Sequence, residues 1–379
     1  MTSVEGFADP AFGGLRELLQ RNLDDGTDAG ASVCVVRDGE TVVDLWGGVA
    51  DVDSGAPWVK DTVVNTYSLT KTMTALAALV LVDRGLLDVD APVAHYWPEF
   101  AANGKDGVLV RHVLGHTSGV SGWQEAVTLA DICDDVRAED LLARQAPWWE
   151  PGTSSGYHAT NYGHLVGGVV RRITGRSLGE FFATEVAGAC GADYLIGTPA
   201  DVDPRVAPLI APPPTGFDYA ALPPDGVFVK TMVNPVIPVP ETSSRLWRGA
   251  EIGGANGHGN ARSVAVVQSV VSHGGRTPVG EQLLRPETVD RIFDVQADGV
   301  DQVLGASLRF GLGYALPAPA VHPSIPDGRV CWWTGYGGSI VVNDLDRRMT
   351  FAYVMNKMTP QLLGAARTEE YVAQAYAAL

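Results

Sequence analysis

The stretch Tyr67-Ser68-Leu69-Thr70-Lys71 decides how this sequence is interpreted, because it opens the most apolar helical pattern of the chain. The pattern runs from Leu69 to Arg84, and Gly85 follows where a left-handed residue would end a helix. Residues three apart lie on one face of a helix, so the amine of Lys71 can reach the hydroxyl of Ser68. A serine and a lysine in that relation suit a nucleophile and its base.

Two interpretations of this pair stay open at the level of the residues. The lysine is followed by apolar side chains at Met73, Leu76, Ala77, Leu79 and Val80. Burial disfavours an ammonium and lowers its pKa, which an amine base needs at neutral pH. The helix N-terminus adds backbone donors that can hold an oxyanion. Alternatively, Ser68 only caps the helix and Lys71 extends to solvent along its apolar stem.

Working outward, strand patterns occur near both ends of the chain. Four runs rich in β-branched residues lie in two pairs: Ala31 to Val36, Thr41 to Trp46, Gly338 to Asn343 and Met349 to Met355. Asp38-Gly39 lies between the first two runs and is a hairpin signal. The turn Asp344-Leu345-Asp346-Arg347 separates the last two. We therefore expect one sheet that is built from the two termini.

Helical patterns occupy most of the middle. They are expected at Phe12 to Asn22, Val110 to Leu114, Asp140 to Arg144, Gly163 to Thr174, Ser177 to Val186, Ala261 to Ser272 after an Asn260 cap, and from Pro360 to the end. The prediction is an α/β fold of the α+β type, with an antiparallel sheet flanked by helices. Residues 1–379 form a single domain, with an α/β subdomain at about 1–65 and 270–379 and a helical subdomain at about 66–269.

The segment from Pro199 to Pro240 contains 11 of the 24 prolines and therefore cannot be a regular helix or a central strand. Four large apolar or aromatic residues are spaced through it: Phe217, Tyr219, Phe228 and Met232. A disordered linker would not need them. We expect a long ordered loop that packs over other parts of the molecule.

Composition excludes several classes of function. The chain has 379 residues, 46% of them hydrophobic, and a formal net charge of −17 that repels nucleic acid and anionic membranes. The N-terminus has no basic region followed by an apolar stretch, and the apolar run from Ala75 to Val82 is too short to span a bilayer. Four separated cysteines form no C-x-x-C pair, which favours buried thiols. We expect a soluble cytoplasmic protein without metal or other cofactor.

Two later stretches can complete a site around Ser68. Tyr157 lies at the mouth of a helix after Glu150-Pro151-Gly152, where its phenol can relay the serine proton. Trp333-Thr334-Gly335-Tyr336-Gly337-Gly338 leads into a strand, and its small residues let backbone N–H groups approach a substrate. From spacing alone, Tyr157 can equally be a packing aromatic and the glycines a bend.

With these motifs in order, the sequence resembles the serine β-lactamase-like superfamily, in the branch of class C β-lactamases and family VIII carboxylesterases. Supporting phrases are Arg84-Gly85-Leu86-Leu87-Asp88, Leu114-Gly115-His116-Thr117-Ser118-Gly119 and Tyr353-Val354-Met355-Asn356. The resemblance implies that Ser68 is the nucleophile, Lys71 its base and Tyr157 the second-motif tyrosine. It also implies an oxyanion hole made of the N–H groups of Ser68 and Tyr336.

The third motif and its surroundings would bind the substrate through Trp333, Thr334, Gly335 and His158. Two departures from the family pattern bear on that substrate. Tyr157-His158-Ala159 lacks the asparagine of the class C Tyr-x-Asn motif, and Trp333 stands where β-lactamases usually have a lysine. The missing cation removes the group that attracts a β-lactam carboxylate, and family VIII esterases resemble this pattern. We therefore expect an ester substrate and a neutral Tyr157, with an ordinary pKa of about 10, hydrogen-bonded to a deprotonated Lys71.

Three other motifs weigh less. Gly152-Thr153-Ser154-Ser155-Gly156 fits G-x-S-x-G, but no strand precedes it as a nucleophile elbow requires. His112 and His116 are four apart without the glutamate of a zinc motif, so a turn is the better interpretation. Asn256-Gly257-His258-Gly259 lacks the third glycine of a dinucleotide fingerprint and more plausibly shapes a pocket wall.

The function expected from the sequence is a serine hydrolase that forms an acyl-enzyme on Ser68, a carboxylesterase for short-chain or small acyl esters. An acyltransferase that passes the acyl group to an alcohol or amine would use the same residues. A weak β-lactamase or DD-peptidase-like enzyme and a non-catalytic ligand-binding protein are further alternatives. The expected partner is a small-molecule ester or acyl donor.

Overall fold

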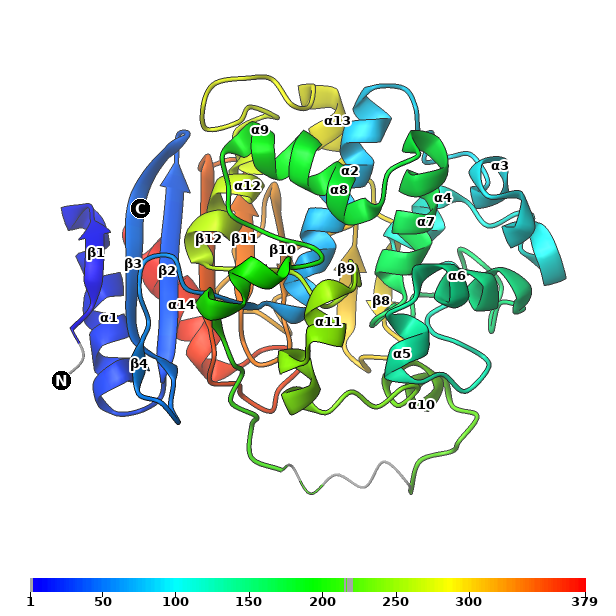
Figure 1. Ribbon diagram of the computed structural model, residues 1–379. Helices are drawn as coiled ribbons and strands as arrows, with labels where there is room; N and C mark the ends of the chain where they lie inside the picture. Colours follow the sequence, from blue (N-terminus) through cyan, green and yellow to red (C-terminus); the bar gives the residue numbers. More distant parts are fainter. Residues whose placement is uncertain (1–2, 215, 217–220) are drawn as a thin grey trace.

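The computed structural model describes residues 3–214, 216 and 221–379, and its main sheet is antiparallel (Figure 1). The strand order is β1-β3-β2-β12-β11-β10, and β4 pairs with β3 to make seven strands. Their bounds are β1 (Glu5–Ala8), β2 (Gly30–Arg37), β3 (Glu40–Asp51), β4 (Ala56–Pro57), β10 (Val330–Thr334), β11 (Ile340–Asp344) and β12 (Met349–Met355). The pairing of β2 with β12 joins the two ends of the chain, which confirms the predicted fold class.

Alternate residues of these strands face two separate apolar cores, because side chains alternate across a strand. In β2, Val33 and Val35 belong to one core, whereas Cys34 and Val36 belong to the other. Helices α1 (Gly13–Asp24) and α14 (Ala366–Tyr376) pack against the first face. Helix α12 (Ala261–Ser272) covers the second face and lies between the sheet and α2. The side chain of Asn260 caps α12, as the sequence predicts.

Helix α2 (Thr70–Asp83) is the central helix of the molecule, and each of its side chains from Thr70 to Leu81 is buried. It follows the predicted span closely. A single 3₁₀ turn, Tyr67–Leu69, leads into it, and Gly85 follows with a φ of 68°. A helix that is apolar on all sides needs neighbours on all sides, and α7, α8 and α12 supply them.

The helical part of the chain follows most of the predicted spans. Its helices are α3 (Val93–Tyr96), α4 (Val110–Leu114), α5 (Leu129–Ile132), α6 (Asp135–Arg144), α7 (Tyr162–Thr174), α8 (Leu178–Phe182) and α9 (Gly188–Cys190). Helix α6 begins earlier than predicted because the side chain of Asp134 caps it by accepting from the Arg137 N–H. One π-helical turn, Ala183–Ala187, joins α8 to α9.

The C-terminal helix was predicted from Pro360 onward, and that start is wrong. Helix α14 begins at Ala366, because Gly364 has a φ of 65° that a helix cannot contain. Shorter elements complete the fold: β5 (Val63–Asn65), β6 (Val206–Ala207), β7 (His258–Gly259), β8 (Ala297–Val300), β9 (Ser307–Phe310), α10 (Val227–Met232), α11 (Arg245–Gly249) and α13 (Pro286–Asp290).

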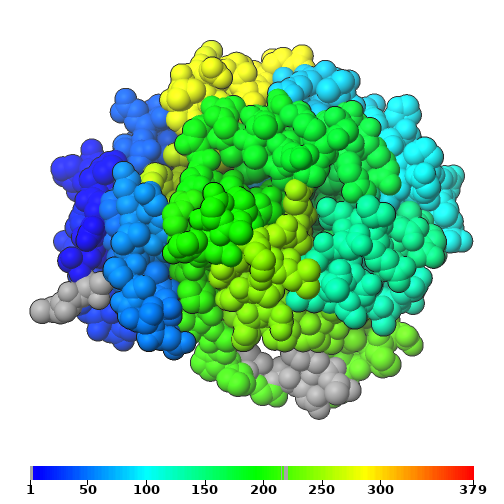
Figure 2. All heavy atoms as spheres, in the orientation of Figure 1, coloured from blue at the N-terminus to red at the C-terminus, as the bar shows by residue number. Residues whose placement is uncertain are grey.

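The proline-rich segment is ordered where the structure describes it. Phe228 and Met232 lie on α10 and are partly buried against the core that contains Tyr157. Phe217 and Tyr219 lie outside the described residues. Ile210 donates its backbone N–H to the Asn356 carbonyl, which attaches the segment to the end of β12. Figure 2 shows the middle of the chain, in green, spread over the face between the blue N-terminal part and the cyan helices.

Two observations concern compartment and covalent links. Among the described residues, none of the helices combines the length and apolarity that crossing a bilayer requires. The four cysteines are free thiols, and Cys34, Cys190 and Cys331 are buried.

Candidate active site

Ser68 lies on the 3₁₀ turn that precedes α2 and is partly exposed, as a nucleophile must be. The residue before it, Tyr67, has a φ of 46°, which is a strained conformation for a side-chain-bearing residue. Thr70 holds this turn by donating its hydroxyl to the Tyr67 carbonyl at 2.5 Å. The turn directs Ser68 out of the buried helix and toward the sheet.

Lys71 is buried beneath Ser68, and its Nζ lies 3.2 Å from the Ser68 Oγ. The same nitrogen donates to the carbonyls of Ala159 at 2.6 Å and Gly254 at 2.7 Å. Burial lowers the pKa of Lys71 well below its ordinary value of 10.5. A neutral amine has two N–H bonds and one lone pair. With both N–H bonds on carbonyls, the lone pair is left for the proton of the Ser68 hydroxyl.

Tyr157 is buried beside this pair, and the Ser68 side chain acts on its hydroxyl and offsets part of the effect of burial on its pKa. The indole N–H of Trp333 donates to the same hydroxyl at 3.4 Å. Burial raises the pKa of Tyr157 above its ordinary value, so the expected ordinary value is wrong and the phenol stays protonated. The expected hydrogen bond to Lys71 is replaced by a contact of the Nζ with the ring face, 4.6 Å from its centroid. The two carbonyls that receive the lysine N–H bonds explain the difference.

The third motif lies at the end of β10, next to the nucleophile turn. A Cβ atom on Gly335 would come within 2.1 Å of the Thr66 carbonyl oxygen, so only glycine permits this approach. The rings of Tyr67 and Tyr336 meet edge to face, with centroids 5.6 Å apart. The Thr334 hydroxyl is engaged within the turn, where it donates to the Ser339 carbonyl at 2.8 Å. Residues 335 and 336 therefore lie against Thr66 and Tyr67, the two residues before Ser68.

Trp333 is a wall of the site and is almost fully buried. Its ring packs against Tyr157, Phe310 and His116, with centroid distances of 5.2, 5.5 and 6.3 Å. Burial lowers the pKa of His116 well below its ordinary value, so the imidazole is neutral. A neutral aromatic cluster thus occupies the position of the third-motif side chain.

His158 does not suit the substrate-binding role expected from the sequence. Its side chain is fully buried, and both ring nitrogens are engaged, one with the Ser118 hydroxyl at 2.6 Å and the other with the Gly156 carbonyl at 2.7 Å. Burial lowers its pKa to about 3. The ring supports the loop that carries Tyr157, because it joins the Gly156 carbonyl of that loop to the Ser118 hydroxyl, 40 residues earlier in the sequence.

Sequence reasoning missed two residues that contact the site. Gly254 supplies one of the two carbonyls that bind Lys71. Asp301 is buried, and one carboxyl oxygen accepts from the N–H of Tyr157 at 3.1 Å and from two N–H groups of its own loop, at Val303 and Leu304. Neither residue lies in a recognisable motif. Their roles depend on contacts 183 and 144 residues apart in sequence.

The three lesser motifs of the sequence make contacts that indicate structural roles. Ser154 lies in a turn rather than after a strand, and its carbonyl accepts from the Trp149 indole at 2.9 Å. His112 and His116 each use Nδ1 to accept a backbone N–H at 3.2 Å, and no group of three metal-ligating side chains occurs in the described part of the chain. Gly257 braces the nucleophile turn, since its carbonyl accepts from the Thr66 N–H at 2.9 Å.

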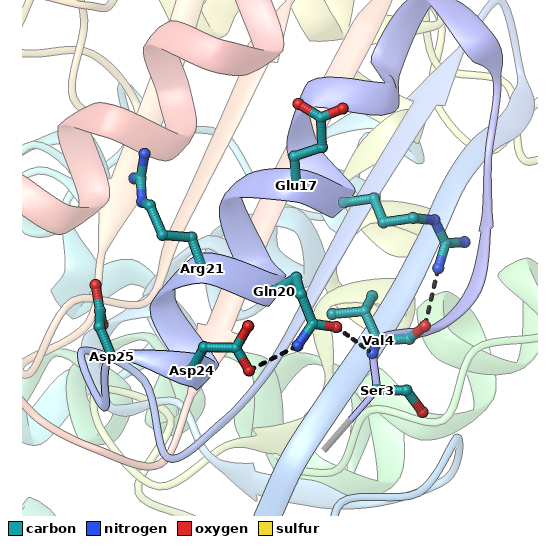
Figure 3. Close-up of a pocket in the computed structure, with 8 residues that line it drawn as sticks. Ser3, Val4, Glu17, Gln20, Arg21, Asp24 and Asp25 are labelled. Atoms are coloured by element: carbon teal, nitrogen blue, oxygen red, sulfur yellow. Dashed lines mark hydrogen bonds between the residues drawn. The ribbon is translucent and has the colours of Figure 1, made fainter. Parts of the chain in front are cut away.

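A groove along α1 lies outside this site. The groove has a volume of about 720 Å³ and is lined by Ser3, Val4, Arg16, Glu17, Gln20, Arg21, Asp24 and Asp25. Figure 3 shows the side chains that line it. Gln20 joins Val4 to Asp24, and Arg16 donates to the Val4 carbonyl at 2.9 Å. None of the predicted site residues lines it, so the candidate active site remains the one around Ser68.

Comparison with known proteins shows similarity in sequence and in fold. A family model described as Beta-lactamase covers residues 15–375. The chain is 34% identical over 372 residues to the Esterase/beta-lactamase LipL of Mycobacterium tuberculosis, which spans 95% of this chain and 84% of the relative. A family VIII carboxylesterase structure superposes with a TM-score of 0.92 and 38% identity, covering 99% of this chain and 100% of the other. A penicillin-binding protein homologue from Caulobacter crescentus also has a TM-score of 0.92, with 33% identity and the same coverage.

Proposed function

Because this chain belongs to the beta-lactamase family, we propose that it is a carboxylesterase that forms an acyl-enzyme at Ser68 with small neutral esters. Its relatives place it among the serine hydrolases, and several of them are named as esterases. One observation carries the assignment to Ser68: the Lys71 Nζ lies 3.2 Å from its Oγ and has carbonyl partners for two N–H bonds. That arrangement leaves a lone pair for the serine proton.

In the proposed acylation, the Ser68 Oγ forms a bond to the ester carbonyl carbon while its proton passes to the Lys71 Nζ. The backbone N–H groups of Ser68 and Tyr336 would stabilise the oxyanion. The C–O bond to the alcohol then breaks, and the alcohol leaves with the proton that Lys71 received from Ser68. The raised pKa of Tyr157 keeps its phenol protonated, so that the hydroxyl would donate a hydrogen bond to the departing oxygen.

Deacylation would reverse the same steps with water in place of the alcohol. Water attacks the acyl carbon and loses a proton to Lys71, and the acid leaves as the Ser68 Oγ recovers that proton. Hydrolysis and acyl transfer use identical residues and differ only in the attacking nucleophile.

The neutral surroundings of the third motif support an ester rather than an anionic substrate. Trp333 presents an indole where a lysine would attract a carboxylate, and His116 and His158 have lowered pKa values that keep them uncharged. The net charge of −17 opposes anionic ligands further. We therefore expect short acyl esters of neutral alcohols to be preferred over β-lactams.

The experiment is a mass-resolved acylation assay. We expect p-nitrophenyl acetate to give a burst of p-nitrophenol and one acetyl group on the peptide that contains Ser68. A panel with p-nitrophenyl butyrate, a chromogenic cephalosporin and added alcohol or amine acceptors separates the alternatives. Faster turnover of the cephalosporin would favour a β-lactamase, as part of the name of LipL suggests for that protein. Acylated acceptor as the main product would favour an acyltransferase, and no acyl-enzyme at all would favour a binding protein.

A further inference from the structure

We propose that Arg367 and Thr368, in the first turn of α14, are positioning residues that aim the Tyr336 N–H at the oxyanion site. The inference rests on the proposed function, in which that N–H stabilises the oxyanion. It assigns a role in catalysis to the C-terminal helix, whose side chains carry no motif and contact the turn after β10.

The turn has little conformational preference of its own. Gly337 has a φ of 100° and Gly338 a φ of 122°, in a region that essentially only glycine adopts. Consecutive glycines lose more backbone entropy on ordering than other residues do. Contacts from outside the turn must therefore hold the peptide planes.

Arg367 makes such a contact, because its Nη2 donates to the Gly337 carbonyl at 3.1 Å. That carbonyl and the Gly338 N–H belong to one planar peptide and point in opposite directions. The Gly338 N–H donates to the Gly335 carbonyl at 3.1 Å. The Gly335 carbonyl shares its own peptide with the Tyr336 N–H, again in opposite directions. Two peptide planes in series thus transmit the position of the guanidinium to the proposed oxyanion donor.

The guanidinium is itself held from several sides. Asp28 pairs with it at 3.0 Å, and the carbonyls of Thr27 and Lys357 accept from it at 2.8 and 2.7 Å. The hydroxyls of Tyr353 and Tyr371 donate to the two Asp28 oxygens at 2.5 and 2.8 Å. A buried ion pair is weak grounds for stability, since desolvation offsets its attraction. The many directional contacts of the Arg367 guanidinium are better explained if they position the turn after β10.

Thr368 adds a second anchor one residue along. Its hydroxyl donates to the Gly338 carbonyl at 2.8 Å, so both carbonyls after Tyr336 are held by neighbouring side chains of α14. Thr359 also donates its N–H to the Gly337 carbonyl at 2.9 Å. Because this third anchor persists when α14 is changed, loss of Arg367 should loosen the turn rather than unfold it.

The test compares substrate turnover with binding of a transition-state mimic. For Arg367→Gln we expect kcat on p-nitrophenyl acetate to fall about tenfold or more, KM to change less than threefold, and an aryl trifluoromethyl ketone to bind more weakly by the same factor as kcat. The double variant Asp28→Asn/Arg367→Gln leaves no unpartnered carboxylate and should show the same changes in kcat, KM and binding of the ketone. Thr368→Val should show a smaller loss in the same parameters. Glu370→Gln, an exposed change on the same helix, is the control and should leave kcat unchanged.

Unchanged kcat in all three variants would overturn the inference, and so would a loss of kcat without weaker binding of the ketone. If Arg367→Gln fails to fold, Thr368→Val decides, because it removes one hydroxyl at nearly constant volume. Hydrogen exchange of the peptide that contains Tyr336 supplies a readout that needs no activity. Faster exchange in Arg367→Gln is expected even if wild type forms no acyl-enzyme, so failure of the proposed function is distinguishable from failure of the positioning role.

Discussion

Two buried lysines in this molecule show how one side chain serves two different ends. Lys71 lies under Ser68 and Lys105 lies in the helical part, and both are almost fully inaccessible to solvent. The Nζ of Lys105 donates to three main-chain carbonyls, those of Ala102, Ala143 and Gln145. The Nζ of Lys71 has two carbonyl partners, and its third neighbour is a hydroxyl.

The difference lies in the third partner rather than in burial. Burial lowers the pKa of both amines, to about 8 for Lys105 and well below 10.5 for Lys71. Three carbonyls use all three N–H bonds of an ammonium, so Lys105 ties the end of α6 to the preceding loop. Two carbonyls leave one position of Lys71 open toward a hydroxyl that can give up its proton. Burial alone therefore does not mark a catalytic lysine.

The largest effect is expected from removing the Ser68 hydroxyl, the partner that distinguishes Lys71 from Lys105. We expect Ser68→Ala to lower kcat/KM for p-nitrophenyl acetate by about 10⁴-fold or more, because no other group forms the acyl bond. Ser154→Ala is the matched control and should stay within twofold of wild type, since Ser154 lies in a turn. Equal activity of Ser68→Ala and wild type would refute the assignment.

Replacing each lysine by alanine in turn sharpens the comparison. Lys71→Ala should lower kcat/KM by about 10³-fold through loss of the general base. Lys105→Ala should keep kcat/KM within about threefold and lower the melting temperature, because three buried carbonyls lose a donor at a cost of about 1 kcal/mol or more each. Circular dichroism melts and ester kinetics on both proteins check this. Loss of activity in folded Lys105→Ala would contradict it.

The next largest effects on kcat/KM are expected from pH and from the variant Tyr157→Phe. The base works when it is deprotonated, so kcat/KM should rise with pH along a single limb whose midpoint lies below the ordinary lysine value of 10.5. Tyr157 adds no limb in that range, because its pKa is raised. Tyr157→Phe should lower kcat/KM by about 10²-fold without moving the midpoint. An inactive Tyr157→Phe beside an active Lys71→Ala would reverse the two roles.

A smaller effect is expected from placing a cation near Lys71. In Trp333→Lys, the ratio of kcat/KM for a chromogenic cephalosporin to that for the neutral ester should rise about tenfold, because the substrate carboxylate gains an opposite charge. Activity on the ester should fall, since the indole leaves its aromatic neighbours. The same two assays on wild type and variant measure the ratio, and a ratio that does not rise would show that Trp333 does not set the preference for neutral esters.

The smallest effect is expected from metal chelators, which should leave kcat/KM unchanged. The proposed nucleophile and base would act without a metal, and His112 and His116 already accept backbone N–H groups. Inactivation by a chelator that zinc reverses would restore these histidines as candidate ligands.

Much of the fold follows from local patterns in the sequence. The runs rich in β-branched residues predict the strands β2 and β12, and Asp38-Gly39 predicts the hairpin between β2 and β3. The apolar run after Ser68 predicts α2 to within a residue or two. The start of α14 was missed, because one glycine with a positive φ outweighs an otherwise helical segment.

In the candidate site too, local features follow from the sequence and contacts between distant segments do not. Ser68 and Lys71 are one helical turn apart, so their approach is local and readable from spacing. The orientation of Tyr157, the engaged nitrogens of His158 and the role of Asp301 depend on partners far along the chain. Motifs therefore predicted which residues gather around Ser68 better than they predicted what each side chain contacts.

By itself, the sequence determined four strands of the main sheet, the central helix and the serine and lysine one helical turn apart, because these depend on backbone periods of two and 3.6 residues. Only the tertiary structure decided that Lys71 has two carbonyl partners, that its amine faces the Tyr157 ring rather than the hydroxyl, and that α14 holds the turn after Tyr336. Hydrogen bonds and desolvation act between atoms that are close in space. The fold brings such atoms together from segments whose sequences carry no mark of one another.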